Sequence, residues 1–89
     1  MPADAFSRAA HLMQQSVREE RTCYTADTEV AIWLAAACVK DGSIAAIGVS
    51  EDTLHYYRGT LHGYPWRVVV FGPYEILPRR PMEVKNAVG

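Results

Sequence analysis

Histidine and cysteine are the side chains of this sequence that could bind a metal ion or act as nucleophiles. They occur at scattered positions: His11, Cys23, Cys38, His55 and His62. Metal sites usually contain closely spaced pairs, such as Cys-x-x-Cys or two histidines one helical turn apart, and the sequence has no such pair. Cys38 lies in the apolar run 30–39, whereas a reactive thiolate needs an exposed, electropositive setting. We therefore expect no metal site, and a reduced, buried Cys38.

Other catalytic patterns are also missing from the sequence. Glu19 and Glu20 are adjacent carboxylates, but neighbours on a helix point about 100° apart and would not act together on one substrate. Neither a glycine-rich phosphate loop nor a Gly-x-Ser-x-Gly motif occurs. The sequence predicts a protein that is not an enzyme and that uses no cofactor.

Aromatic residues and arginines gather in the second half of the chain. The candidate partner-binding residues are Tyr56, Arg58, Tyr64, Trp66, Arg67 and Tyr74. These residue types are enriched at protein interfaces, where they anchor the binding energy. For Trp66 and the neighbouring Tyr57, the competing interpretation is that they form the core of a small sheet. The pattern favours binding to a protein over catalysis.

Size and charge narrow the choice further. The chain has 89 residues, of which 49% are hydrophobic and 21% charged, and its formal net charge is −1. Such a composition is typical of one small globular domain, which buries about 60% of its unfolded surface. The near-zero net charge supplies no long-range attraction to nucleic acid. We expect a cytoplasmic protein, because the N-terminus lacks signal-peptide character and the longest apolar run is too short to span a bilayer.

Two helices are predicted in the N-terminal half. Apolar residues recur every three or four positions over residues 4–21, which indicates an amphipathic helix. Asp27 is a candidate N-cap for a second helix over residues 28–40, which is apolar on nearly all sides. Gly42 suits the left-handed position that follows such a helix. Residues 23–26 are interpreted as the connector between the two helices.

The segment after Gly42 can be interpreted in two ways, and the first is a sheet. Three stretches rich in β-branched and aromatic residues are the expected strands, with a fourth candidate after them: 43–49, 53–61, 66–71 and 74–77. Reversals are expected at 50–52 and 62–65. Alternation along the second strand places Arg58 on one face, and His55 and Tyr57 on the other. An antiparallel sheet of this kind would give the two apolar helices a surface to cover.

In the second interpretation, residues 50–58 form a short helix. The run GVSEDTLHYY, residues 48–57, resembles the turn and second helix of a helix-turn-helix, as found in the mercury-resistance type of regulator. The resemblance implies that Gly48 makes the turn and that Val49 and Leu54 are buried. It also implies that Thr53, His55 and Arg58 face DNA. The same segment carries Glu51 and Asp52, whereas DNA binding normally rests on several lysines and arginines.

We expect an α+β domain over residues 1–77, with two N-terminal helices packed on a small antiparallel sheet of three to four strands. Residues 78–89 are expected to form an extended tail. The expected function is that of a non-catalytic protein-binding module, an inhibitor or adaptor of a larger protein complex. An anti-CRISPR protein, a phage or mobile-element inhibitor of a host defence machine, would fit this profile. A homodimer through open sheet edges stays an option, a DNA-binding regulator is the alternative, and no membrane partner is expected.

Overall fold

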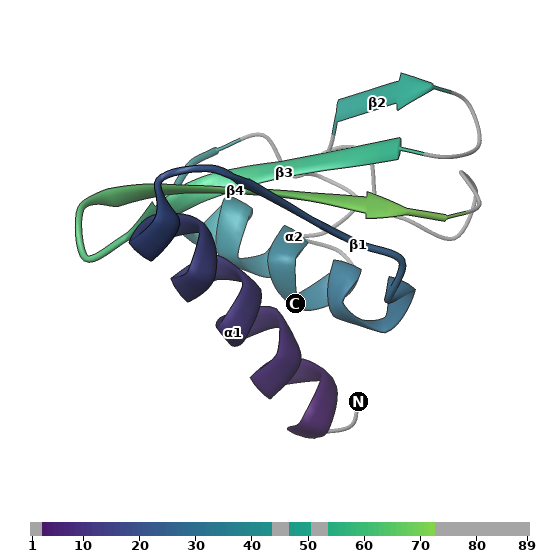
Figure 1. Cartoon of the computed structure of the whole chain (residues 1–89), viewed down its shortest axis with the longest axis horizontal. Coiled ribbons are helices and arrows are strands. Elements are labelled where there is room, and N and C mark those ends of the chain that lie inside the picture. The colour runs from purple at the N-terminus through teal and green to yellow at the C-terminus, as the bar shows by residue number, and fades with distance from the viewer. Residues whose placement is uncertain (1–2, 44–46, 51–53, 73–89) are drawn as a thin grey trace.

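The computed structural model describes residues 3–43, 47–50 and 54–72. Its elements, in chain order, are α1 (Ala3–Glu19), β1 (Thr22–Thr25), the 3-10 turn η1 (Thr28–Val30), α2 (Ala31–Lys40), β2 (Ile47–Ser50), β3 (Leu54–Leu61) and β4 (Tyr64–Phe71). The strands form one sheet in the order β1-β4-β3-β2. Both helices lie on the same side of this sheet (Figure 1). The α+β class is confirmed, and the other side of the sheet carries no helix among the described residues.

Helix α1 packs against the rest of the protein through small residues. Ala5 and Ala9 are fully buried, because a methyl side chain lets the helix approach its neighbours closely. Phe6, which belongs to the predicted apolar stripe, is 51% exposed. Its ring meets Trp33 of α2 edge-on, with 5.0 Å between the ring centroids. The stripe therefore joins the two helices as well as covering the sheet.

The C-terminal end of α1 closes with a left-handed residue that is not glycine. The helix ends at Glu19, and Glu20 has a φ of 51°. The backbone N–H groups of Glu20 and Arg21 donate to the carbonyls of Val17 and Ser16, each at 3.2 Å. This is the Schellman arrangement, in which glycine usually occupies the left-handed position because other residues are strained there.

The second helix is found where the sequence predicts it, but its cap differs. Asp27 precedes η1 and makes no side-chain cap hydrogen bond. Its carboxylate instead accepts a hydrogen bond from Nε of Arg8 at 2.5 Å, and this interaction lowers the pKa of Asp27 below its ordinary value. Gly42 has the predicted left-handed conformation, with a φ of 76°.

Within the described residues, no helix is long and apolar enough to cross a membrane.

The expectation of a purely antiparallel sheet is wrong, because residues 22–25 form a strand. β1 pairs in parallel with β4, with Thr22 opposite Arg67 and Thr25 opposite Val70. The sheet is therefore mixed. The connector interpretation failed because a four-residue strand carries little pattern of its own, and its partner lies more than forty positions away in the sequence.

The hairpin of the sheet interpretation is confirmed. β3 and β4 pair antiparallel along their whole length, from Leu61–Tyr64 at the turn to Leu54–Phe71 at the far end. The turn is shorter than predicted, with only His62 and Gly63 between the strands, and both have a positive φ. The predicted helix over residues 50–58 is wrong for its described part, since Leu54 to Arg58 lie within β3.

The first strand of the predicted sheet appears as β2, which pairs antiparallel with β3. The strand covers Ile47–Ser50, and residues 44–46 of the predicted strand 43–49 lie outside the described part of the chain. The other predictions in this half fall on residues that lie outside the described part of the chain. They are residues 51–52 of the predicted turn, the first residue of the predicted strand 53–61, the candidate strand 74–77 with Tyr74, and the tail 78–89. Ser50, the first residue of the predicted turn, belongs to β2 instead.

The core lies between the helices and the side of the sheet that faces them. Its largest fully buried side chains are Trp66, Tyr57, Leu34, His55, Val30, Val68, Val70, Cys38 and Ser16. Burial raises the pKa of the Cys38 thiol to about 12 and also raises the pKa of Tyr57. The expectation of a buried, unreactive Cys38 agrees with this surrounding, since a thiol with a raised pKa is a poor nucleophile at neutral pH.

Candidate functional site

The side of the sheet turned away from the helices, here called the outer face, carries the candidate site. Side chains alternate along β3, so that His55, Tyr57 and Gly59 are buried while Arg58 and Thr60 are exposed. This confirms the alternation predicted for the strand. Because the strands are in register, the outer-face side chains form rows that run across the sheet.

One row is basic. Arg58 and Arg67 are directly opposite each other, both are exposed, and Thr22 of β1 lies beyond Arg67. In a two-residue hairpin this pair is of the non-hydrogen-bonded type, in which opposite side chains come closest. Residues of such a pair do not exchange backbone hydrogen bonds, so the backbone N–H of Arg67 points away from β3. It donates to Oγ of Ser16 at 2.8 Å.

The arginine row has no counter-charge among the described residues. The ion pairs of the described residues involve Arg8 and Arg21, both outside the sheet. No carboxylate occupies an outer-face position of β1, β3 or β4 in the described residues. Like charges placed directly opposite on a sheet are destabilising. The row is therefore a local concentration of positive charge on a chain whose net charge is close to zero.

The adjacent rows are aromatic and aliphatic. Tyr24, Val69 and Tyr56 lie side by side on β1, β4 and β3. Phe71, one row further along β4, stacks on Tyr24 with 6.1 Å between ring centroids and 30° between the ring planes. Tyr24 is 60% exposed and Phe71 41% exposed. Val69 is 7% exposed, so the outer face has an apolar floor between the rings.

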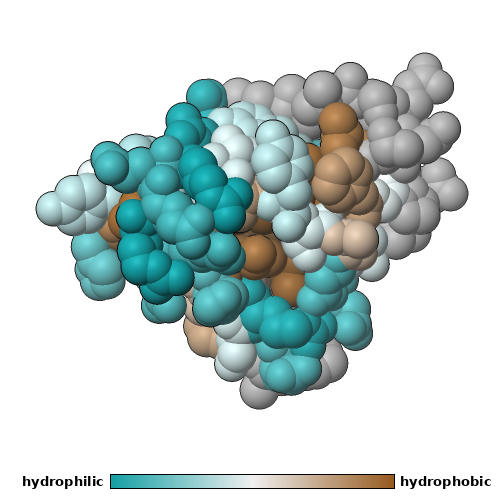
Figure 2. All heavy atoms as spheres, in the orientation of Figure 1, coloured by the Kyte–Doolittle hydropathy of each residue, from teal (hydrophilic) through white to brown (hydrophobic). Residues whose placement is uncertain are grey.

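Figure 2 shows how surface character is distributed over the side of the molecule that carries β1. Hydrophobic surface gathers toward the region where β1 and β4 end, and hydrophilic side chains cover the region where β1 begins. The order of the outer-face rows itself comes from the strand register. The candidate site thus has a basic end and an aromatic end, in immediate contact.

The structure brings together only part of the predicted binding residues. Tyr56, Arg58 and Arg67 share the outer face. Trp66 is 1% exposed and belongs to the core, as the competing interpretation proposed, because it alternates with Arg67. Tyr64 is 64% exposed, but it lies at the hairpin end and is not on the outer face.

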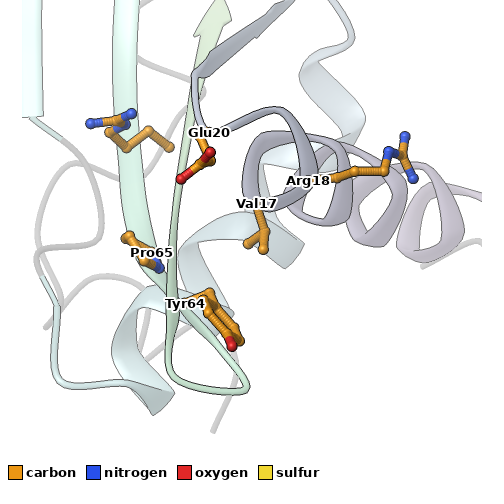
Figure 3. A pocket seen from close by; sticks show the side chains of 6 residues that line it. Val17, Arg18, Glu20, Tyr64 and Pro65 are labelled. Atoms are coloured by element: carbon orange, nitrogen blue, oxygen red, sulfur yellow. The ribbon is translucent and has the colours of Figure 1, made fainter.

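Tyr64 borders a hollow of about 460 Å³ between the hairpin end and the C-terminal end of α1. The hollow is lined by Val17, Arg18, Glu20, Tyr64, Pro65 and Arg67. In Figure 3 the Val17 side chain is directed toward the Tyr64 ring, whereas Arg18 points away from it. The lining combines apolar Val17 and Pro65 with charged side chains, and through Arg67 the hollow adjoins the outer face.

The remaining chemistry-bearing residues are not gathered into one site. His11 is exposed on α1 and borders a second hollow with Arg8 and Asp27, while Cys38 and His55 are buried on the other side of the sheet. Among residues 3–43, 47–50 and 54–72 there is no group of three or more histidine, cysteine, aspartate or glutamate side chains that could hold a metal ion.

Comparisons with protein families, with curated proteins and with solved structures each found no match. The proposal for function therefore rests on the chemistry of the outer face. Two of its residues, Tyr24 and Phe71, were not among the sequence candidates. The alternation of Thr22, Cys23, Tyr24 and Thr25 is a strand signal that could have indicated an exposed Tyr24, but the stack on Phe71 depends on the pairing of β1 with β4.

Proposed function

We propose that this protein is a binding module that docks on another protein through the outer face of its sheet, as an inhibitor or adaptor of a larger complex. The observation that carries the proposal is the exposed Tyr24–Phe71 stack, which lies one row from the unpaired Arg58 and Arg67. Tyrosine, phenylalanine and arginine are the residue types enriched at protein interfaces.

The energetics of the isolated chain support this proposal. Two aromatic side chains that stay 60% and 41% exposed keep apolar area in water that a partner could cover, at about 25 cal/mol for each Å² buried. The arginine row adds repulsion that an anionic partner group would remove. Both features lower the stability of the isolated folded chain. Both also favour a complex in which a partner covers the aromatic rings and neutralises the arginines.

The strands around the outer face also suit a docking surface. β3 and β4 pair over all eight residues of each strand, so the backbone under the exposed side chains is held by regular sheet hydrogen bonds. Side chains on a rigid support lose less conformational freedom when they bind, which leaves more of the contact energy for affinity. The face is thus organised before a partner arrives.

The test is affinity capture from a lysate of the organism that encodes the chain, compared between three forms of the tagged protein. The wild type and Phe6→Ala should retain the same partner, and the double variant Tyr24→Ala with Phe71→Ala should lose it, because hot-spot truncations cost about 2 kcal/mol or more each. Phe6 is the matched control, since it is an exposed aromatic residue on α1. Circular dichroism would verify that all three forms are folded.

A partner that the double variant retains as well as the wild type does would contradict the proposal. So would a partner that is lost only with Phe6→Ala, because that would move the binding surface to the helices. The helix-turn-helix alternative gains no support from the segment that suggested it, since its residues 54–58 belong to β3.

A further inference from the structure

Resting on the proposed function, we propose that the outer face receives an acidic, extended segment of the partner protein, with carboxylates beside an apolar side chain. The carboxylates would bind the arginine row, and the apolar side chain would cover the Tyr24–Phe71 stack. Three arguments carry this inference: the charge of the face, the spacing of its rows and the lack of carboxylates on the same described positions of a second copy.

The charge of the face calls for an anionic partner. Three acidic side chains of the described residues have other partners: Asp27 pairs with Arg8, Glu19 with Arg21, and Asp41 accepts the backbone N–H of Thr60 at 2.7 Å. Glu20 borders the hollow beside Arg67 but forms no ion pair with it. Two exposed guanidinium groups in register can each bind a carboxylate through two parallel hydrogen bonds.

The spacing of the rows matches an extended chain. Arg67, Val69 and Phe71 follow one another at two-residue steps on β4, so successive rows are about 7 Å apart at roughly 3.3 Å per residue. Side chains two residues apart on an extended partner segment have the same spacing and point the same way. An acidic residue followed two positions later by an aromatic or aliphatic residue would therefore meet the arginine row and, at the same time, the neighbouring row that contains Tyr24 of the stack.

A second copy of this chain is a poor occupant of the face. A two-fold symmetric contact uses the same patch on both copies, and the described outer-face positions of β1, β3 and β4 hold no carboxylate. A second copy therefore brings no counter-charge from these positions to Arg58 and Arg67, and any contact between the two arginine rows would disfavour association. The outer face is therefore complementary to a different, acidic surface.

The first experiment titrates the ¹⁵N-labelled chain of 89 residues with the capped peptide Ser-Glu-Ser-Phe-Ser-Glu and follows the backbone amide shifts. We expect the shifts to cluster at Tyr24, Arg58, Arg67 and Val69, and to diminish as sodium chloride is added. A peptide with glutamine in place of glutamate should bind roughly tenfold more weakly, since it keeps the aromatic contact but loses the charges. Equal binding of the two peptides, or no response to the acidic one, would overturn the inference.

The second experiment reverses one charge while keeping the fold. Arg58→Glu places a carboxylate opposite Arg67, so the hairpin gains a cross-strand ion pair and the melting temperature should not fall. Affinity for the acidic peptide should nevertheless drop at least about tenfold. The matched control is Lys40→Glu, which reverses an exposed charge at the end of α2 and should leave the affinity unchanged. Loss of affinity with the control and not with Arg58→Glu would place the acidic site elsewhere.

The two proposals fail in different ways. If Arg58→Glu still captures the natural partner while the Tyr24→Ala and Phe71→Ala double variant does not, the docking surface stands and the acidic segment is wrong. If capture depends on neither change, the docking surface itself is wrong.

Discussion

Gly59 is enclosed by two neighbouring side chains because it lies opposite Trp66 in the hairpin. A Cβ atom at this position would lie 2.9 Å from the indole carbons Cε2 and Cζ2, and 2.8 Å from Oδ2 of Asp41. Gly59→Ala should therefore lower the free energy of unfolding by about 1–3 kcal/mol, since the buried ring must shift. Urea unfolding would measure this, with the exposed neighbour Thr60→Ala as the control. A more stable Gly59→Ala would mean that strand propensity outweighs the close contact.

Glu20 is the opposite case at the residue scale, because a non-glycine residue occupies a position at which glycine would be favoured. Its φ of 51° is a left-handed conformation that costs a non-glycine residue roughly 1 kcal/mol. Glu20→Gly should raise the free energy of unfolding by about 0.5–1 kcal/mol, measured by thermal or urea unfolding. Glu19→Gly is the matched control and should destabilise, since Glu19 lies within α1 and pairs with Arg21. A loss of stability with Glu20→Gly would show that its side chain contributes more than its backbone strain costs.

At the scale of elements, the buried Ser16 hydroxyl holds the end of α1 to strand β4. It donates to the carbonyl of Arg21 at 2.7 Å and accepts from the backbone N–H of Arg67 at 2.8 Å. Ser16→Ala would leave two backbone groups without this partner, so we expect a loss of about 1–3 kcal/mol in unfolding free energy. Ser7→Ala, on the exposed side of the same helix, should change it by less than about 0.5 kcal/mol. Equal effects of the two changes would contradict this role.

At the scale of the whole molecule, the buried acids of the core predict loss of stability at alkaline pH. Burial raises the pKa of Cys38 from 9.0 to about 12 and also raises that of Tyr57. The unfolded chain therefore loses these protons first, and above about pH 9 stability falls as pH rises, by up to about 1.4 kcal/mol per pH unit for each group. Urea unfolding from about pH 7 to about pH 11 should show this decline. When the unfolding free energy of each protein is expressed relative to its own value at pH 7, the decline should be shallower in Cys38→Ala than in the wild type. Equal declines in the two proteins would exclude a contribution from Cys38.

Part of the candidate site could be predicted from the sequence by residue type. The sequence proposes Tyr56, Arg58 and Arg67 as interface candidates, and the structure places all three on the outer face. Trp66 was grouped with them because type alone does not tell which face of a strand a residue occupies. Its burial follows from its position one residue before Arg67 on β4, where the alternate side chain turns toward the helices.

The sequence by itself determined the two helices and the strands of the hairpin, because these follow from local periodicity, β-propensity and the glycine of a tight turn. Gly42 and Gly63 both have the positive φ that their positions require. Only the tertiary structure decided the place of β1, the Tyr24–Phe71 stack and the arginine row's neighbours. Each depends on pairing between residues far apart in the chain, and a four-residue strand such as Thr22–Thr25 is formed by its partner strand more than by its own propensity.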